Sequence, residues 1–184
     1  HASHFALDPA GGFVYDHDGS AATTDSFVYR VDNGHGGAAI ATCTILITPR
    51  NVAPVLTSPG QQTVRFGGSL VFSTALGNAI TFSDADANGH VEQLTLAVAR
   101  GTLTLSTTTG LTFLSGTGAN DTALTIQGTL ADINAAFEGL TYTPEAGSTT
   151  ADTLQIQADD MGNTGAGGAL IATAAVPIQV AAVV

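Results

Sequence analysis

The chain has 184 residues, of which 44% are hydrophobic and 10% charged, a balance that provides a core and excludes a disordered chain. Fifteen acidic and four basic residues give a net charge of −11, which argues against nucleic acid and anionic membranes as partners. No run of about 18 apolar residues occurs, so no membrane insertion is predicted. The chain begins at His1 without Met, and we expect it to be a piece of something longer, from a secreted or cell-surface β-protein.

Alternating apolar residues predict β-strands along most of the chain. Phe27, Tyr29 and Val31 form one such stripe, and a second stripe runs from Ala39 to Ile47. Further strands are predicted near 54–66, 70–83 and 91–99, then two between 102 and 128, and two more near 152–158 and 169–180. This pattern favours an all-β fold of the β-sandwich kind.

One short helix is predicted after these middle strands. Thr129 provides the N-cap, Asp132 occupies the third helical position, and Gly139 ends the helix. The apolar face consists of Leu130, Ile133, Ala136 and Phe137. A single short helix between strands fits a crossover connection in a β-sandwich.

The sequence contains two copies of one unit, offset by 127 residues. The stretch 12–15 matches 139–142, and 25–29 matches 152–156. After a four-residue insertion, 36–42 matches 167–173. Counterparts of residues 51–138 do not precede the first copy, so that copy contains only the back half of the unit.

The boundary between the copies lies at two prolines. Pro49 and Pro54 stop the preceding strand and stiffen the link. We therefore predict the C-terminal half of a first module at 1–49, a linker at 50–54 and a complete second module at 55–184. The modules are predicted to be Greek-key β-sandwiches of the immunoglobulin type in tandem.

Strand direction in such a sandwich places several acidic loops at one end. The loops 83–90 and 159–163 should both lie where the chain enters the second module, next to the linker. They carry Asp84, Asp86, Asn88, Asp159 and Asp160. In the first module, the loop with Asp16 and Asp18 should lie at the exit end, facing the same linker.

A convergence of carboxylates requires a counter-charge. Each pair of like charges at about 4 Å costs roughly 1–4 kcal/mol, and Arg50 is the single basic residue nearby. Calcium is the usual cation for flexible cages of oxygen ligands. The sequence predicts Asp84, Asp86 and Asp159 as ligands, with Asp160, Asn88 and Asn51 as additions and Asp16 and Asp18 reaching across from the first module.

Other readings of these acidic residues stay open. The segment starting at Asp84 also has the beginning of an EF-hand loop, but its twelfth position is Thr95 rather than Glu. The same loop can be a polar turn held by local hydrogen bonds, and so can the turn with Asp16 and Asp18. Asp25 and Asp152 occupy equivalent strand starts, where we expect them to bond local backbone.

The ordered motifs resemble the cadherin-like repeats of large bacterial surface adhesins. The pieces that carry the resemblance lie at 12–15, 25–29, 32–37, 51–55, 82–86, 128–135, 140–144 and 159–165. In that family, such repeats form calcium-rigidified stalks. By resemblance, Asp84 and Asp86 match the Asp-x-Asp calcium motif and Asp159 matches a later aspartate. The family linker usually reads Asn-Asp, whereas this chain has Asn51-Val52, which predicts a weakened site with a Kd in the extracellular range of about 10⁻⁴–10⁻³ M.

The leading functional prediction is a structural extender of an adhesin, with calcium as cofactor and neighbouring repeats of the same chain as partners. One alternative is a carbohydrate- or protein-binding module. Another is a surface-filament subunit completed by strand exchange, since half a sandwich exposes strand edges through which chains can associate. No nucleophile–base motif such as Gly-x-Ser-x-Gly occurs, and the acids cluster at module ends rather than in a groove, so we predict no enzymatic activity.

Overall fold

The computed structural model describes residues 1–20 and 22–182. Its internal contacts divide the chain into two compact units, His1–Arg50 (unit 1) and Asn51–Val184 (unit 2). Each unit is built from antiparallel strands, and each is described separately. In the described part of the chain, neither helix has the length and apolar character needed to cross a membrane.

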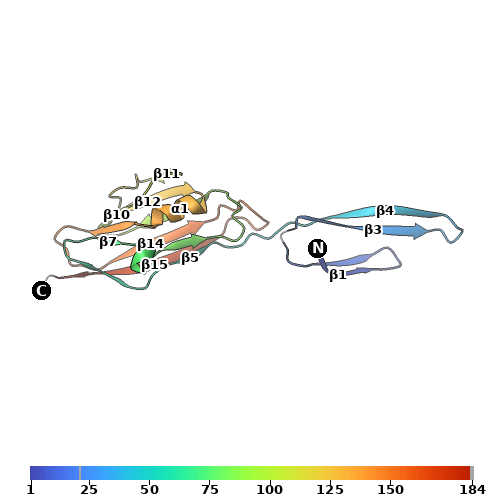
Figure 1. Cartoon of the computed structure of the whole chain (residues 1–184), viewed down its shortest axis with the longest axis horizontal. Coiled ribbons are helices and arrows are strands. Elements are labelled where there is room, and N and C mark those ends of the chain that lie inside the picture. The colour runs from blue at the N-terminus through green and yellow to red at the C-terminus, as the bar shows by residue number, and fades with distance from the viewer. Residues whose placement is uncertain (21, 183–184) are drawn as a thin grey trace. The chain divides into compact units, whose positions relative to one another are not determined.

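Unit 1 consists of two β-hairpins that lie side by side (Figure 1). Strands β1 (Ala2–Leu7) and β2 (Phe13–His17) form the first, and β3 (Thr24–Asp32) and β4 (Ala38–Leu46) form the second. Three aromatic rings pack between the hairpins, with the Phe27 ring centroid 4.6 Å from that of Phe5 and 5.1 Å from that of Phe13. None of the described residues of unit 1 is buried, so these hairpins have no closed core.

Unit 2 is a layered β-structure whose main sheet has six strands. Their order is β11-β12-β9-β14-β15-β6, antiparallel except for the parallel pair of β15 with β6. The strands are β6 (Gln62–Arg65), β9 (Glu92–Ala97), β11 (Thr112–Ser115), β12 (Ala123–Gly128), β14 (Asp152–Asp159) and β15 (Ile171–Ala181). The expected strands near 91–99, 152–158 and 169–180 therefore lie together in this sheet.

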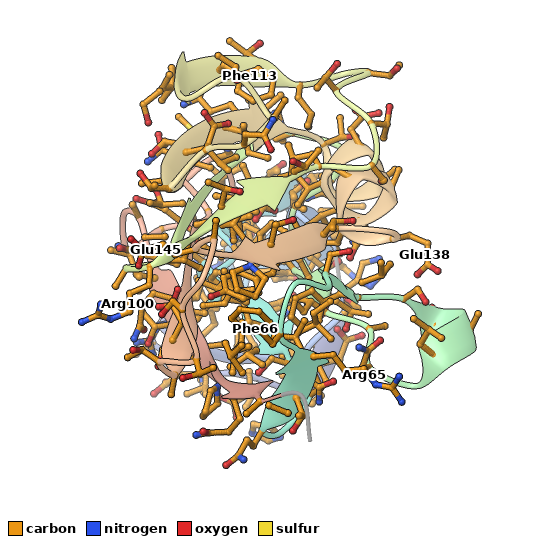
Figure 2. All side chains as sticks on the ribbon, turned by 90° about the vertical axis from the view of Figure 1, so that its left-hand side faces the viewer. Arg65, Phe66, Arg100, Phe113, Glu138 and Glu145 are labelled. Atoms are coloured by element: carbon orange, nitrogen blue, oxygen red, sulfur yellow. The ribbon has the colours of Figure 1, made fainter. Side chains whose placement is uncertain are left out.

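Shorter strands form the opposing layer of unit 2. One sheet has the order β10-β13-β7, and β5 pairs with β8. These strands are β5 (Val55–Thr57), β7 (Leu70–Val71), β8 (Thr81–Ser83), β10 (Gly101–Thr104) and β13 (Thr141–Pro144). Residues of both layers, such as Leu96 and Leu154 from the main sheet and Leu103 and Tyr142 from the other, form one buried core. In Figure 2, Arg65, Arg100 and Glu138 point outward from this packed unit.

The helix expected after residue 129 is confirmed as α1 (Leu130–Phe137). The Thr129 side chain accepts a hydrogen bond from the Asp132 backbone N–H at 3.3 Å, which caps the first turn. Gly139 has a φ of +101°, a backbone conformation that favours glycine and ends the helix. Ile133, Ala136 and Phe137 bury the apolar face of α1 in the core.

The single strand predicted near 70–83 is wrong. This segment forms β7, a one-turn 3₁₀-helix η1 (Thr74–Leu76) and β8. Ser73 caps η1, and Gly77 follows it with a φ of +70°. Asn78 stabilises the segment between β7 and β8, because its Oδ1 accepts from the Ser73 N–H and its Nδ2 donates to the Val71 carbonyl. Local turn chemistry thus overrides the apolar alternation.

Candidate functional site

Five polar residues of unit 2 come from four separate places in the sequence to one end of the sandwich. Asn51 precedes β5, and Asp84 and Asp86 follow β8. Glu92 is the first residue of β9, and Asp160 follows β14. We call these five residues the acidic cluster. Asn51, Glu92 and Asp160 are all at most 5% exposed.

Asn51 and Asp160 form the most firmly held part of the cluster. The Asn51 Nδ2 donates to Asp160 Oδ2 and to the Gly168 carbonyl, each at 2.7 Å. Asp160 Oδ1 accepts from the backbone N–H groups of Gly162 and Leu170, both at 2.8 Å. These bonds connect the start of unit 2 to the connection between β14 and β15.

Asp86 forms the second connection to the start of unit 2. Its Oδ2 accepts from the Val52 N–H at 3.1 Å, and its backbone carbonyl accepts from the Thr164 hydroxyl at 2.6 Å. Its own N–H donates to Asp84 Oδ1 at 3.1 Å. The other carboxylate oxygen, Asp86 Oδ1, is buried and has no hydrogen-bond partner in the described part of the chain.

Glu92 is the functional candidate that the sequence predictions missed. Its side chain is 1% exposed, and neither carboxylate oxygen has a hydrogen-bond partner among residues 1–20 and 22–182. A buried carboxylate without partners is strongly disfavoured. The strand alternation in the sequence could have found it. Glu92 lies two residues before Leu94 and four before Leu96, so its side chain lies on the same inward face of β9 as theirs.

The pKa values of the cluster reflect burial and mutual repulsion. Burial, together with the negative charges of Asp84, Asp160 and Asp86, raises the pKa of Glu92 to about 7. Burial, together with the neighbouring Asp86 carboxylate, raises the pKa of Asp84 to about 6. The pKa of Asp86 is lowered because hydrogen bonding to Asp84 and to the Val52 N–H outweighs the opposing effect of burial. At neutral pH the cluster therefore carries negative charge at an energetic cost.

The carboxylate and amide oxygens of the acidic cluster are the kind of ligand that a hard cation prefers, but the structure does not group them around one point. Calcium takes six to eight oxygen ligands from carboxylates, amide carbonyls and water. No ion pair among the described residues reaches the acidic cluster. In the described residues, no three or more His, Cys, Asp and Glu side chains are grouped so that they could hold a metal ion. The oxygens of Glu92 and Asp86 that have no hydrogen-bond partner among the described residues are the observation that fits cation binding.

Two further predicted ligands of unit 2 are engaged in their own turns. Asp159 Oδ1 accepts from the Met161 N–H at 2.8 Å. Asn88 is exposed, has a φ of +48°, and donates from Nδ2 to the Asp86 carbonyl at 2.9 Å. Their role as ligands stays a prediction, since the structure gives both of them a local structural role.

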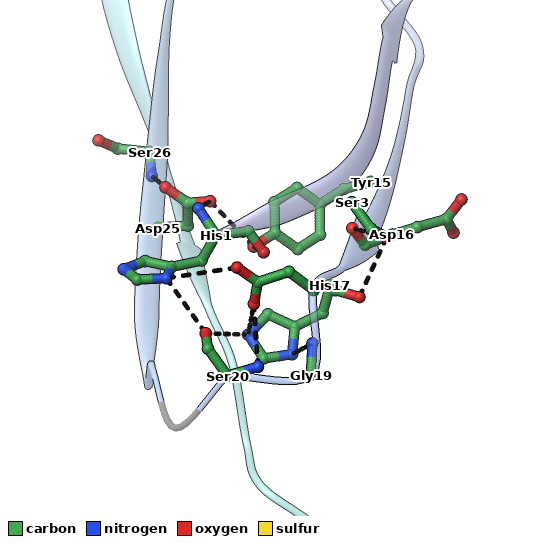
Figure 3. Close-up of polar contacts among 10 residues, drawn as sticks. His1, Ser3, Tyr15, Asp16, His17, Gly19, Ser20, Asp25 and Ser26 are labelled. Carbon is green, nitrogen blue, oxygen red and sulfur yellow. Dashed lines mark hydrogen bonds and ion pairs between the residues drawn. The ribbon is translucent and has the colours of Figure 1, made fainter.

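In unit 1, the predicted ligand Asp16 lies in β2, and Asp18 lies in the connection between β2 and β3 (Figure 3). Asp18 Oδ1 accepts from the Ser20 N–H at 2.9 Å, and its carboxylate lies 3.7 Å from His1 Nδ1 and 3.5 Å from His17 Nε2. Hydrogen bonds from Ser20 hold the pKa of Asp18 below its usual value. The Asp16 side chain is exposed. The structure thus shows a hydrogen-bonded turn at this position.

One hydrogen-bonded pair occurs in both units at the 127-residue offset. The Tyr142 hydroxyl donates to Asp152 Oδ2 at 2.9 Å in unit 2, and the Tyr15 hydroxyl donates to Asp25 Oδ2 at 3.0 Å in unit 1. Each aspartate also accepts from the N–H of the next residue at 2.8 Å, as expected for strand starts that bond local backbone. The same two residue types therefore make the same side-chain contact in both units.

No family model matches the chain, and no curated protein matches it. Among solved structures, the chain is similar to a cohesin module from the family 33 glycoside hydrolase of Clostridium perfringens. The two are 12% identical, the match covers 70% of this chain and 98% of that module, and the TM-score is 0.37.

Proposed function

We propose that the protein is a calcium-binding, non-enzymatic extender segment of a secreted or cell-surface adhesin. The observation that carries the proposal is Glu92, a buried carboxylate with no hydrogen-bond partner among the described residues, whose pKa is raised by the negative charges of three other carboxylates. Calcium would be held by carboxylate oxygens of Asp84, Asp86, Glu92 and Asp160, with the Asn51 side-chain oxygen as a further ligand. The cation supplies charge neutralisation, and the side chains supply its oxygen ligands.

The proposal also explains why the cluster includes the first residues of unit 2. The Asn51 side chain and the Val52 N–H each donate to a carboxylate of the cluster. A cation that fixes Asp86 and Asp160 would therefore also fix the chain at 51–52. Restricting this segment limits the freedom of the link at 50–54, which is what a stalk segment requires.

Isothermal titration calorimetry with calcium chloride, after removal of metal with a chelator, tests this function. We expect one site in unit 2 with a Kd of about 10⁻⁴–10⁻³ M. Backbone ¹⁵N relaxation should show reduced motion of residues 51–54 upon saturation. The variants Glu92→Gln and Asp84→Asn should each weaken binding at least tenfold.

Asp16→Asn and Asp18→Asn are the matched controls, because they remove the same kind of charge from unit 1. Unchanged calcium binding in both variants would restrict the site to unit 2, as proposed. Calcium binding lost in these controls but retained in Glu92→Gln would contradict the proposed ligand set. Absence of any binding at millimolar calcium would contradict the function itself.

A further inference from the structure

The outer face of the main sheet of unit 2 is almost free of charge. The outward side chains of β12, β9, β14 and β15 are the alternate residues in 123–127, 93–97, 153–159 and 171–179, because the residues between them point toward the core. All of these outward residues are Gln, Thr, Ala, Ile or Pro except Asp159 at the end of β14. Unit 2 nevertheless carries ten of the fifteen acidic residues and two of the four basic residues of the chain. Its charges therefore lie almost entirely away from this surface, which we call the neutral face.

The neutral face has a raised centre. Gln155 and Gln157 on β14 are both exposed. Gln155 pairs with Ala97 on β9 and with Ala175 on β15, and Gln157 pairs with a threonine on each of the same two strands. Since glutamine is longer than alanine or threonine, β14 forms a ridge with a trough on each side. The trough over β9 continues into a shallow hollow of about 440 Å³, whose lining includes Ala97, Thr153 and Gln155.

The chemistry of the neutral face suits a partner without charge. The exposed amides of Gln155 and Gln157 each carry two N–H donors and an acceptor oxygen. The hydroxyls of Thr95 and Thr125 lie 3.2 Å apart, and each can donate or accept. Ile171, which is 53% exposed, adds apolar area at one end. Such a surface pairs with amides, hydroxyls and methyl groups rather than with ions.

A second copy of the chain meets these requirements. Two chains with a net charge of −11 each repel one another wherever acidic surfaces approach, and the neutral face is the surface of unit 2 where this repulsion is smallest. The face is also complementary to itself, because its ridge and a trough lie on adjacent strands. A two-fold axis parallel to the strands, between β14 and β9, places the ridge of each copy over the β9 trough of the other.

The size of the neutral face predicts how strong this association is. At a strand spacing of about 4.8 Å and a rise of about 3.3 Å per residue, the five adjacent strands from β11 to β15 present roughly 500 Å². Two copies would then bury about 1,000 Å² in total, an area typical of weak, transient complexes rather than of permanent dimers. We therefore expect a dimer that forms at high micromolar concentrations of the chain.

We propose that two copies of this chain associate through the neutral face of unit 2. Gln155 of each copy lies over Ala97 of the other, and Gln157 lies over Thr95. This register follows from the two-fold axis, which keeps residues that are paired between β14 and β9 at the same level along the strands. The association uses none of the ligands of the proposed calcium site, so it does not depend on the proposed function.

Sedimentation equilibrium of the whole chain at micromolar to millimolar concentrations, in chelator and reducing agent, measures the association. The chelator keeps the result independent of calcium, and the reducing agent prevents cross-linking through Cys43. We expect a monomer–dimer equilibrium that added salt strengthens, because salt screens the repulsion between two acidic chains. A chain that stays monomeric at millimolar concentration would overturn the proposal.

Substitutions on the two layers of unit 2 locate the interface. Gln155→Glu places a carboxylate at the centre of the neutral face and should weaken dimerisation about tenfold or more. Thr143→Glu is the matched control, because Thr143 is an exposed residue of β13 in the opposing layer and the variant adds the same charge. The control should dimerise like the wild type. Dimerisation that is unchanged in Gln155→Glu, or equally weakened in Thr143→Glu, would contradict the assignment to the neutral face.

A charge pair tests the register. Ala97→Arg and Gln155→Glu should each weaken self-association when measured alone, with circular dichroism showing that each variant is folded. An equimolar mixture of the two variants should form heterodimers, because the introduced carboxylate of one chain then faces the introduced guanidinium of the other. A mixture that associates no better than the separate variants would show that the proposed register is wrong.

Discussion

Replacing Glu92 by glutamine separates the energetic cost of the buried charge from its use in binding calcium. The pKa of Glu92 is raised from an ordinary value of 4.5 to about 7, mainly by burial and then by the nearby carboxylates. This gap corresponds to about 3 kcal/mol. Because the side chain is 1% exposed, little of that energy is lost to solvent screening. A neutral amide of the same shape should remove it.

The sign of the effect follows from proton binding. Between about pH 4.5 and pH 7, folded Glu92 retains its proton while the unfolded side chain has lost it, so the free energy of unfolding falls as pH rises. Without calcium, the wild-type chain should therefore lose up to about 3 kcal/mol between pH 4.5 and pH 8 through this group. Glu92→Gln should lose correspondingly less.

Urea denaturation followed by far-ultraviolet circular dichroism at pH 5 and pH 8, in chelator, measures two quantities. These are the loss of wild-type stability between the two pH values and the difference in stability between the wild type and Glu92→Gln. At pH 8 without calcium, the variant should be more stable than the wild type, by up to about 3 kcal/mol or roughly 10 °C in Tm. With calcium, the wild type should gain stability and the variant should not. A variant that is less stable than the wild type at pH 8 in chelator would refute the reasoning about the buried charge.

Three further substitutions test neighbouring features. Asp152→Asn removes a charged acceptor of four hydrogen bonds, including that of Tyr142, and should lower the free energy of unfolding by about 2–4 kcal/mol in urea. Asp25→Asn should cost less, because the equivalent site in unit 1 is partly exposed. Gly101→Ala would drive a methyl group into the Tyr142 ring and to 2.6 Å from the Thr143 carbonyl, so a Tm decrease equivalent to about 1–3 kcal/mol is expected, and an unchanged Tm would contradict the close packing. Val52→Asp adds a carboxylate beside the acidic cluster, and should lower Tm in chelator but tighten calcium binding in calorimetry; equal affinity would show that this position lies outside the site.

Local signals in the sequence predicted some elements well. Helix α1 was predictable because Thr129 and Gly139 mark its two ends within ten residues of each other. Strands β9, β14 and β15 were predictable because their apolar alternation is unbroken. The division of the 70–83 segment was not, because the side chain of Asn78 folds back on Ser73 and Val71, and no periodic pattern reports such a contact.

The candidate site shows the same division between local and long-range information. The Asp84–Asp86 loop was predictable from its spacing, and strand direction correctly indicated that Asp160 and Asn51 belong near it. Glu92 was missed because a lone glutamate before an apolar strand resembles an ordinary solvated residue. Its importance depends on three carboxylates that arrive from other parts of the chain.

The central claim is that calcium neutralises the acidic cluster of unit 2, and its most direct test is the denaturation midpoint of the wild-type chain at pH 8 as a function of free calcium. A ligand that binds the folded state alone stabilises it by about 2.7 kcal/mol at a hundredfold excess over Kd. The account predicts a gain of this size near 10 mM calcium for a Kd of about 10⁻⁴ M. Identical midpoints in calcium and in chelator would contradict it.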